Sequence, residues 1–417
     1  MNLKSLTRPV LGAALALFTS ASSLALAGVP PKPTPPQAPG APVPQPQPQP
    51  SQQPQPQPSQ QTSQQQARPR IDVVFVLDTT GSMAGLIDGA KQKIFSIASR
   101  IAQGKPTPQV RVGLVAYRDV GDAYVTKRYE LTEDLDGLFT HLRALQADGG
   151  GDTPEHVGRG LGEAVSKLSW DQSRETMKLI FLVGDAPPAQ RNDDWNFKHW
   201  VKRAAEKHIV VNTVRCGGDA ETEVHWKLAA KTTDGRYESL EQSGGMVAVA
   251  TPYDADLAKV NAELASKTMY AGKKEAQVAN RARAEQMAGL APEAAADRIQ
   301  FMKTTRGAGK GSGAAASVSS APAAVGGAVD LAAQPEALAS VKEEELPQEL
   351  QGLDAAGRDA KVKQLAGERK ALEEKAAKLA AERDAWRMKN VADKDDSFDA
   401  NVMKGVKEKA AKHGITY

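Results

Sequence analysis

The sequence predicts an α/β fold in which helices flank a doubly wound, mostly parallel sheet. Between residues 70 and 272, short apolar runs rich in β-branched residues alternate with amphipathic segments, which is the pattern of repeated strand–helix units. The runs are continuously apolar, as expected of strands that are buried on both faces. Clusters of Asp, Thr and Gly directly follow several runs, at the place where sheets of this kind bind ligands.

The composition allows one ordinary domain with long appendages, because a chain of 417 residues with 5% aromatic content cannot form a large core throughout. Basic and acidic residues are nearly balanced at 53 and 50, so the charge pattern of a nucleic-acid-binding protein is missing. Cys216 is the only cysteine, which excludes an intrachain disulfide. We expect its side chain to be buried near a strand end.

The N-terminal region predicts secretion. Residues 1–27 have two basic residues, a short apolar core and a terminal Ala-Leu-Ala pattern, which together are typical of a signal peptide. Residues 28–69 are rich in Pro and Gln and predict a solvated spacer in the polyproline II conformation. The spacer either holds the next domain at a distance or has no mechanical role. We therefore expect a secreted protein that is periplasmic or extracellular, without stable membrane insertion.

Each element of the domain at 70–272 follows from its local pattern. Strands are expected at 71–77, 110–117, 178–184 and 209–215, with a short edge strand within 124–131 and a last strand within 235–240. Helices are expected at 84–102, 156–168, 195–207 and 254–269, because these segments carry apolar residues at three- and four-residue spacing.

Beyond the domain, the sequence predicts a helical extension at 273–304, a flexible low-complexity linker at 305–340 and a helical region at 341–417. Four apolar residues recur at seven-residue intervals and form one stripe on a helix: Leu365, Leu372, Leu379 and Trp386. The companion positions are unsuited to a coiled coil: Val362, Arg369, Ala376 and Arg383. We expect the stripe to pack on another helix or on the main domain, and the chain to end in a short helical hairpin.

Polar side chains gather after three of the predicted strands. Asp78 ends the first strand, with Thr80 and Ser82 at alternate positions after it, so a loop can direct three oxygens to one side. Hard oxygen ligands of this kind suit Mg²⁺ or Mn²⁺ and do not suit zinc. Two further loops, GGGDTPE at 149–155 and the loop that begins with Asp185, follow the same edge of the sheet. The three loops predict one metal site.

The first loop resembles the D-x-[ST]-x-S signature of von Willebrand factor A domains, whose metal-ion-dependent adhesion site is completed by a threonine from a second loop and an aspartate from a third. The resemblance covers residues 70–272, and it extends to a bacterial secreted subset in which GGGD-x-PE and GDAPP recur. It implies that Asp78, Thr80, Ser82 and Asp185 bind the metal ion.

The ligand from the second loop is left open between Asp152 and Thr153. Thr153 would leave two carboxylates on the ion, whereas Asp152 would add a third and weaken the ion's attraction for a further carboxylate. Either residue could instead cap the following helix.

The resemblance implies an adhesion-type function, in which an Asp or Glu of a protein ligand completes the shell of Mg²⁺ or Mn²⁺. The alternative is a structural envelope scaffold, in which the metal only staples the loops and the helical tail contacts the partners. An enzyme is disfavoured, because the sequence has no HExxH or G-x-S-x-G motif and its six histidines are scattered.

Overall fold

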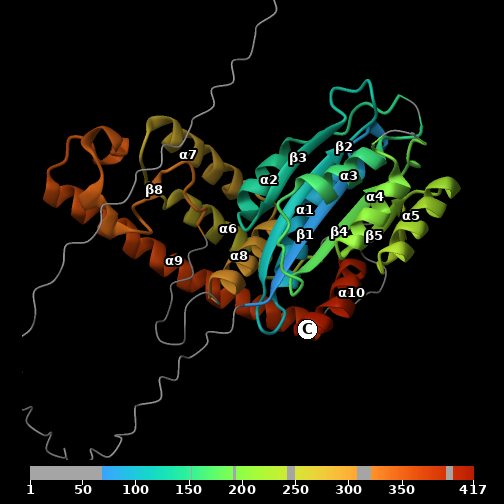
Figure 1. Ribbon diagram of the computed structural model, residues 1–417. Coiled ribbons are helices and arrows are strands. Elements are labelled where there is room, and N and C mark those ends of the chain that lie inside the picture. The colour runs from blue at the N-terminus through green and yellow to red at the C-terminus, as the bar shows by residue number, and fades with distance from the viewer. Residues whose placement is uncertain (1–67, 152, 191–193, 242–248, 308–320, 391–397) are drawn as a thin grey trace, which may run out of the picture. The chain divides into compact units, whose positions relative to one another are not determined.

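The computed structural model describes residues 68–417, apart from residue 152 and the ranges 191–193, 242–248, 308–320 and 391–397 (Figure 1). The predicted signal peptide lies outside the described residues, and so does the predicted spacer at 28–69 except for its last two residues. Asp152, one of the two candidates in the second loop, also lies outside them.

A six-stranded sheet forms the centre of the fold, with the strand order β3-β2-β1-β4-β5-β6. The strands are β1 (Arg70–Asp78), β2 (Gln109–Tyr117), β3 (Thr126–Thr132), β4 (Met177–Gly184), β5 (Ile209–Cys216) and β6 (Tyr237–Leu240). All strand pairs are parallel except the pair of β2 with the edge strand β3, which is antiparallel. The six strands coincide with the six predicted runs, and their pairing confirms the predicted fold class.

Helices flank the sheet on both faces (Figure 1). The predicted helices are present as α1 (Ala84–Ala102), α3 (Val157–Lys167), α4 (Phe197–Glu206) and α6 (Asp254–Ser266). Two further helices have no counterpart in the sequence prediction, α2 (Leu135–Ala144) and α5 (Ala220–Thr232). The buried side of α5 includes Thr222 and His225, whereas Val224 is 65% exposed, so polarity does not mark its packed face.

The core follows from the alternation of side chains along β1, which is buried on both faces. Phe75 and Leu77 point into one apolar cluster, which they share with Phe95 of α1. Val74 and Val76 point into a second cluster on the opposite face, which is built with α3, α4 and α5.

Segments far along the chain complete the first cluster. α7 (Lys274–Ala288) and α8 (Pro292–Gly307) follow α6, and α10 (Phe398–Ala410) lies near the C-terminus (Figure 1). Phe301 of α8 and Val406 of α10 belong to the same cluster as Phe75. The core therefore extends beyond the expected domain boundary at residue 272, because a central sheet needs cover on both faces and part of that cover comes from later helices.

The long helix α9 (Ala355–Asn390) runs along α6 and α8 (Figure 1). Leu372 and Leu379 of the predicted stripe pack on an apolar cluster formed mainly by those two helices, which confirms that the stripe contacts other helices. The more deeply buried positions are the companion ones, including Arg369 at 3% and Arg383 at 1% exposure. The chain end differs from the expected hairpin, since α10 packs against α1.

The described part of the expected linker at 305–340 is packed. β7 (Tyr270–Ala271) pairs antiparallel with β8 (Val329–Asp330), and Leu331 is fully buried after it. Short 3-10 helices complete the chain: η1 (Gly81–Met83), η2 (Pro335–Ser340), η3 (Glu343–Glu345), η4 (Gln348–Leu350) and η5 (Ala411–His413).

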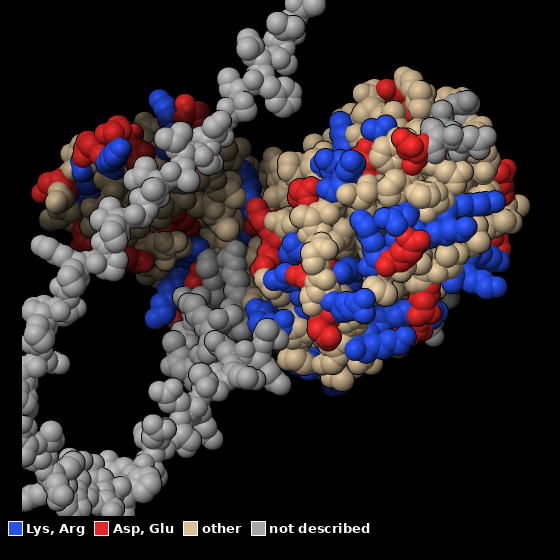
Figure 2. Space-filling view, viewed as in Figure 1, with Lys and Arg blue, Asp and Glu red and all other residues tan. Residues whose placement is uncertain are grey.

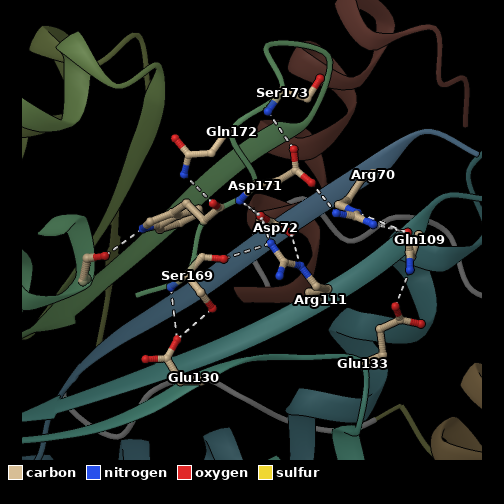
Figure 3. Close-up of polar contacts among 12 residues, drawn as sticks. Arg70, Asp72, Gln109, Arg111, Glu130, Glu133, Ser169, Asp171, Gln172 and Ser173 are labelled. Carbon is tan, nitrogen blue, oxygen red and sulfur yellow. Dashed lines mark hydrogen bonds and ion pairs between the residues drawn. The ribbon is translucent and has the colours of Figure 1, made fainter. Parts of the chain in front are cut away.

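A polar network secures the amino end of the central strands, at the edge opposite to the predicted metal loops (Figure 3). The fully buried carboxylate of Asp72 accepts two hydrogen bonds from Arg111, at 2.8 and 2.6 Å, and one from the amide of Asp171 at 3.0 Å. Arg70 pairs with Asp171 in turn and also donates to Gln109 at 2.8 Å. A bidentate, buried pair of this kind fixes the position of β1 against β2.

Both described ends of the chain are attached to the loop that precedes β2. Arg68 donates to the carbonyl oxygens of Thr107 and Pro108 at 3.1 and 3.0 Å. Thr416 forms a β-bridge with Lys105, whose amide donates to the Thr416 carbonyl at 2.8 Å. The first and last described segments therefore meet at the amino-end edge of the sheet.

Basic and acidic side chains are interspersed over the face shown in Figure 2, in agreement with the nearly balanced composition. Among the described residues, no helix combines the length and apolar character needed to cross a bilayer.

Candidate metal centre

The first loop folds around the side chain of Asp78, the fully buried last residue of β1. Thr80 donates to Oδ1 of Asp78 twice, from its amide at 2.9 Å and from its hydroxyl at 2.7 Å. The Thr80 hydroxyl also lies 3.3 Å from Oγ of Ser82, which is exposed at the rim. The structure therefore brings together the three predicted oxygen groups of this loop.

The second oxygen of Asp78 has the surroundings expected of a cation ligand. Oδ2 is buried and has no hydrogen-bond partner among the described residues, an arrangement that is costly for a carboxylate. Burial, with the nearby charge of Asp185, raises the pKa of Asp78 to about 7 even though the Thr80 hydrogen bonds lower it. A divalent cation at this point would satisfy the oxygen and offset the charge repulsion, so the residues present fit the metal that the first loop implies.

The third loop approaches Asp78 through a glycine. Leu77 lies opposite Val183 in the register of β1 and β4, so Asp185 leaves β4 beside the end of β1. A Cβ on Gly184 would lie 2.3 Å from the Tyr117 hydroxyl and 3.3 Å from Oδ2 of Asp78. Glycine suits this close passage, because a side chain here would have to displace the Tyr117 hydroxyl, which occupies the place of a Cβ.

The second loop contains a buried carboxylate, that of Glu155, which the sequence analysis did not single out. Glu155 is 3% exposed, and its Oε2 is buried without a hydrogen-bond partner among the described residues. Burial first, and then the charges of Asp78 and other nearby carboxylates, raise the pKa of Glu155 to about 8. Thr153, in contrast, is exposed. Glu155 belongs to the GGGDTPE motif, but the family resemblance implies a ligand at Asp152 or Thr153 and none at Glu155.

Backbone contacts place Glu155 next to the third loop. Its amide donates to the carbonyl of Pro187 at 3.1 Å, and its own carbonyl accepts from the amide of Ala189 at 2.8 Å. These two bonds join the second loop to the segment that follows Asp185. A carboxylate that is distant from Asp185 in sequence is thereby held within the same charge cluster.

The composition of the site differs from that of a centre built on carboxylates and imidazoles alone. In the described part of the chain, no group of three or more His, Cys, Asp or Glu side chains could hold a metal ion. The candidate set depends on the hydroxyls of Thr80 and Ser82 beside the carboxylates of Asp78 and Asp185. Such a set suits a hard cation and, with four oxygen-bearing side chains, leaves room for further oxygen ligands in a six-coordinate shell.

Cys216 does not contribute a ligand to this set. It ends β5 and is fully buried, as predicted, and burial raises the pKa of its thiol far above the ordinary value. A neutral, enclosed thiol acts as apolar packing.

Residues 72–252 match the family model described as von Willebrand factor A domain. The rat von Willebrand factor A domain-containing protein 7 is 34% identical over 120 residues, which cover 29% of this chain and 12% of that protein. A putative ariadne-like RING finger protein of Acanthamoeba polyphaga mimivirus is 27% identical over 123 residues, 30% of this chain and 12% of the viral protein. The matched region thus spans about an eighth of these relatives.

Two solved structures are also similar to part of the chain. The SpRpn10 VWA domain matches with a TM-score of 0.33 and 16% identity, over 42% of this chain and 88% of that one. The pilus adhesin SpaC of Lactobacillus rhamnosus GG matches with a TM-score of 0.34 and 15% identity, over 43% and 29% of the two chains. The family match and the strand order together support a von Willebrand factor A domain at residues 72–252.

Proposed function

We propose that this protein is a secreted, divalent-metal-dependent binding module of the adhesion type. Mg²⁺ or Mn²⁺ is held by the strand-end loops, and an Asp or Glu of a protein partner completes its coordination shell. The observation that carries the proposal is Oδ2 of Asp78, a buried carboxylate oxygen with no hydrogen-bond partner among the described residues. It lies at the carboxyl edge of the sheet, where doubly wound folds bind their ligands.

The chain's own residues have distinct parts in this proposal. Asp78 and Asp185 supply negative charge, while Thr80 and Ser82 add neutral oxygens. The second loop contributes one of Asp152, Thr153 or Glu155. The bound ion supplies an electrophilic position for an incoming carboxylate, and a set with few protein carboxylates keeps that position attractive. No hydrolytic step is part of the proposal.

Secretion belongs to the same proposal, because the signal sequence at 1–27 and the Pro/Gln-rich segment at 28–69 favour export to the cell envelope. The face shown in Figure 2 mixes both charge signs, which is unfavourable for nucleic acid as a partner on that face.

A structural scaffold is the second candidate function. α9 is 36 residues long, and Met388 near its end is 84% exposed, so this end of the helix presents an apolar side chain to solvent. In this alternative the metal only joins the loops, and partners bind the C-terminal helices without regard to metal.

The test is calorimetric titration of Mg²⁺ and Mn²⁺ into the full chain and into Asp78→Ala, Thr153→Ala and Glu155→Gln. We expect the unaltered chain to bind the ion saturably and Asp78→Ala not to bind it. Only one of Thr153→Ala and Glu155→Gln should weaken the binding. Asp88→Ala is the matched control, since Asp88 is an exposed carboxylate on α1. Absence of binding in the unaltered chain would exclude the metal-dependent mechanism.

A partner assay then separates the two functions. Envelope proteins captured by the full chain are compared with and without EDTA, and with Asp78→Ala as the second bait. EDTA-sensitive capture that also requires Asp78 supports the adhesion function. Capture that survives both changes supports the scaffold.

A further inference from the structure

We infer that the loop between β2 and β3, residues 118–125, is a brace that holds the first two metal loops in register and so sets the preference of the site for a small cation. The positioning residues are Arg118, Asp122 and Tyr124. The inference rests on the proposed metal function and assigns a role to a loop that supplies none of the candidate ligands.

Arg118 connects the first loop to the second. Its Nε donates to the carbonyl of Thr79 at 3.0 Å, and its Nη2 donates to the carbonyl of Gln146 at 2.7 Å. The side chain is 4% exposed, so both charge-assisted bonds are shielded from water. One planar guanidinium thus fixes the residue after Asp78 relative to the segment that leads into GGGDTPE.

Asp122 holds the glycine turn of the second loop. Its two carboxylate oxygens accept from the amide of Gly150 at 3.3 and 3.1 Å, and Oδ2 also accepts from the amide of Asp119 at 3.1 Å. Gly149 and Gly150 both have positive φ angles, of 78° and 73°. The backbone of this turn therefore favours glycine over other residues, and Asp122 orients the amide of Gly150.

The position of Gly150 is transmitted directly to a candidate ligand. A Cβ on Gly150 would lie 2.7 Å from Cβ of Thr80, so the glycine backbone lies directly against the Thr80 side chain. The amide of Gly81 also donates to the carbonyl of Gly149 at 3.1 Å. A shift of this glycine turn would move Thr80, whose hydroxyl is 2.7 Å from Oδ1 of Asp78.

Tyr124 supports the other side of the first loop. Its hydroxyl lies 2.8 Å from Oγ1 of Thr79, within hydrogen-bond distance, and its ring is flanked by Arg118 at 4.4 Å and by Lys127 at 4.2 Å. Cation–π contacts on the ring restrict its orientation. The brace therefore contacts the first loop through both Arg118 and Tyr124, and the second loop through both Arg118 and Asp122.

A rigid frame matters because cations differ in the geometry that they accept. Mg²⁺ requires a nearly octahedral shell at about 2.0–2.1 Å, whereas Ca²⁺ accepts longer and more variable distances of about 2.3–2.6 Å. Crowded carboxylates repel one another until the ion binds. Loosening the brace should therefore weaken Mg²⁺ binding more than Ca²⁺ binding, which a general loss of stability would not do.

The experiment measures Mg²⁺ and Ca²⁺ affinities of the full chain by calorimetry, for the unaltered protein and for Asp122→Ala, Asp122→Asn and Tyr124→Phe. Asp354→Ala is the matched control, since Asp354 also accepts a glycine amide, that of Gly357 at 2.8 Å, at the start of α9. Thermal unfolding in EDTA is recorded for each variant to detect a loss of fold.

We expect Asp122→Ala to weaken Mg²⁺ binding about 10-fold and Ca²⁺ binding much less, a range seen when groups that orient metal ligands are removed. Asp122→Asn keeps an acceptor for Gly150 and should retain most of the affinity, while Tyr124→Phe should cause a smaller loss with the same selectivity. Equal losses for both ions, or unchanged affinities in Asp122→Ala, would overturn the inference. If the unaltered chain binds neither ion, the proposed metal function itself fails.

Discussion

Arg383 of α9 donates from Nε to Oδ1 of Asp254 across 2.7 Å, although the two residues are 129 positions apart. A second nitrogen of the same guanidinium donates to Asp297 at 2.6 Å. All three side chains are nearly inaccessible, so the long helix is fastened to the start of α6 and to α8 by buried charge as well as by apolar packing.

Removing this arginine is predicted to destabilise the C-terminal helices. Arg383→Met would leave Asp254 and Asp297 buried without their main cation, which typically costs about 3–5 kcal/mol. Urea unfolding monitored by circular dichroism measures the loss. Arg387→Met is the control, because Arg387 is more exposed and contacts Asp297 only at 3.3 Å. Equal effects of the two changes would contradict the prediction.

Truncation at residue 272 is predicted to disrupt the domain. The fragment 70–272 lacks Phe301 and Val406, which cover the same face of the sheet as Phe95, and each lost apolar contact of this size removes about 1.5–3 kcal/mol. We expect the fragment to bind a hydrophobic dye and to lose near-ultraviolet dichroism, in contrast to a fragment of residues 68–417. A cooperative transition at the same midpoint in both fragments would refute this expectation.

Gly184→Ala is predicted to impair both stability and metal binding. The new methyl group would meet the Tyr117 hydroxyl at 2.3 Å and force Asp78 away, at a cost of about 1–3 kcal/mol. Adding Tyr117→Phe should restore part of the loss by removing the clashing oxygen. Gly218→Ala is the control, since no atom lies within 4 Å of its Cβ position. Thermal unfolding and Mg²⁺ titration provide the measurements.

The metal-free protein is predicted to lose stability as the pH rises. The pKa of Asp78 is raised from 3.8 to about 7, so the stability that its neutral form contributes is present below about pH 4 and is lost as the pH passes through about 7. In EDTA, the unfolding free energy of the unaltered chain should fall relative to Asp78→Asn between pH 4 and pH 8, by at most about 4 kcal/mol. Parallel pH profiles would contradict this prediction, and Mg²⁺ should reverse the loss at pH 8.

The strands and the first metal loop are predictable because their signals are local. Asp78, Thr80 and Ser82 lie within five positions of one another, and the apolar run before them places them at a strand end. Glu155 has no comparable local signal, because its place in the site depends on backbone bonds to Pro187 and Ala189. Contacts between separate loops do not appear as a spacing in the sequence.

The C-terminal region shows a second limit of sequence patterns. The leucine stripe of α9 predicts a packed helix, and Leu372 and Leu379 do pack. Arg369 looks unsuited to burial, yet it pairs with Asp330 and Glu373 in the seam. The pair with Glu373 lies within α9 at i,i+4 spacing, whereas Asp330 comes from a separate segment, and that second pairing cannot be read from the helix itself.

The attachment of both described chain ends to the loop before β2 has a mechanical consequence. Arg68 enters the fold directly before β1, and Asp78 ends that strand. If a partner is held at Asp78 and the protein is anchored through the chain before Arg68, tension acts along β1. The load would then pass along the covalent backbone of β1 itself, while the pairing of β1 with β2 on one side and β4 on the other keeps the strand in place. A pull between the two ends of one strand does not require its ladder hydrogen bonds to separate, so the rest of the fold would carry little of that tension.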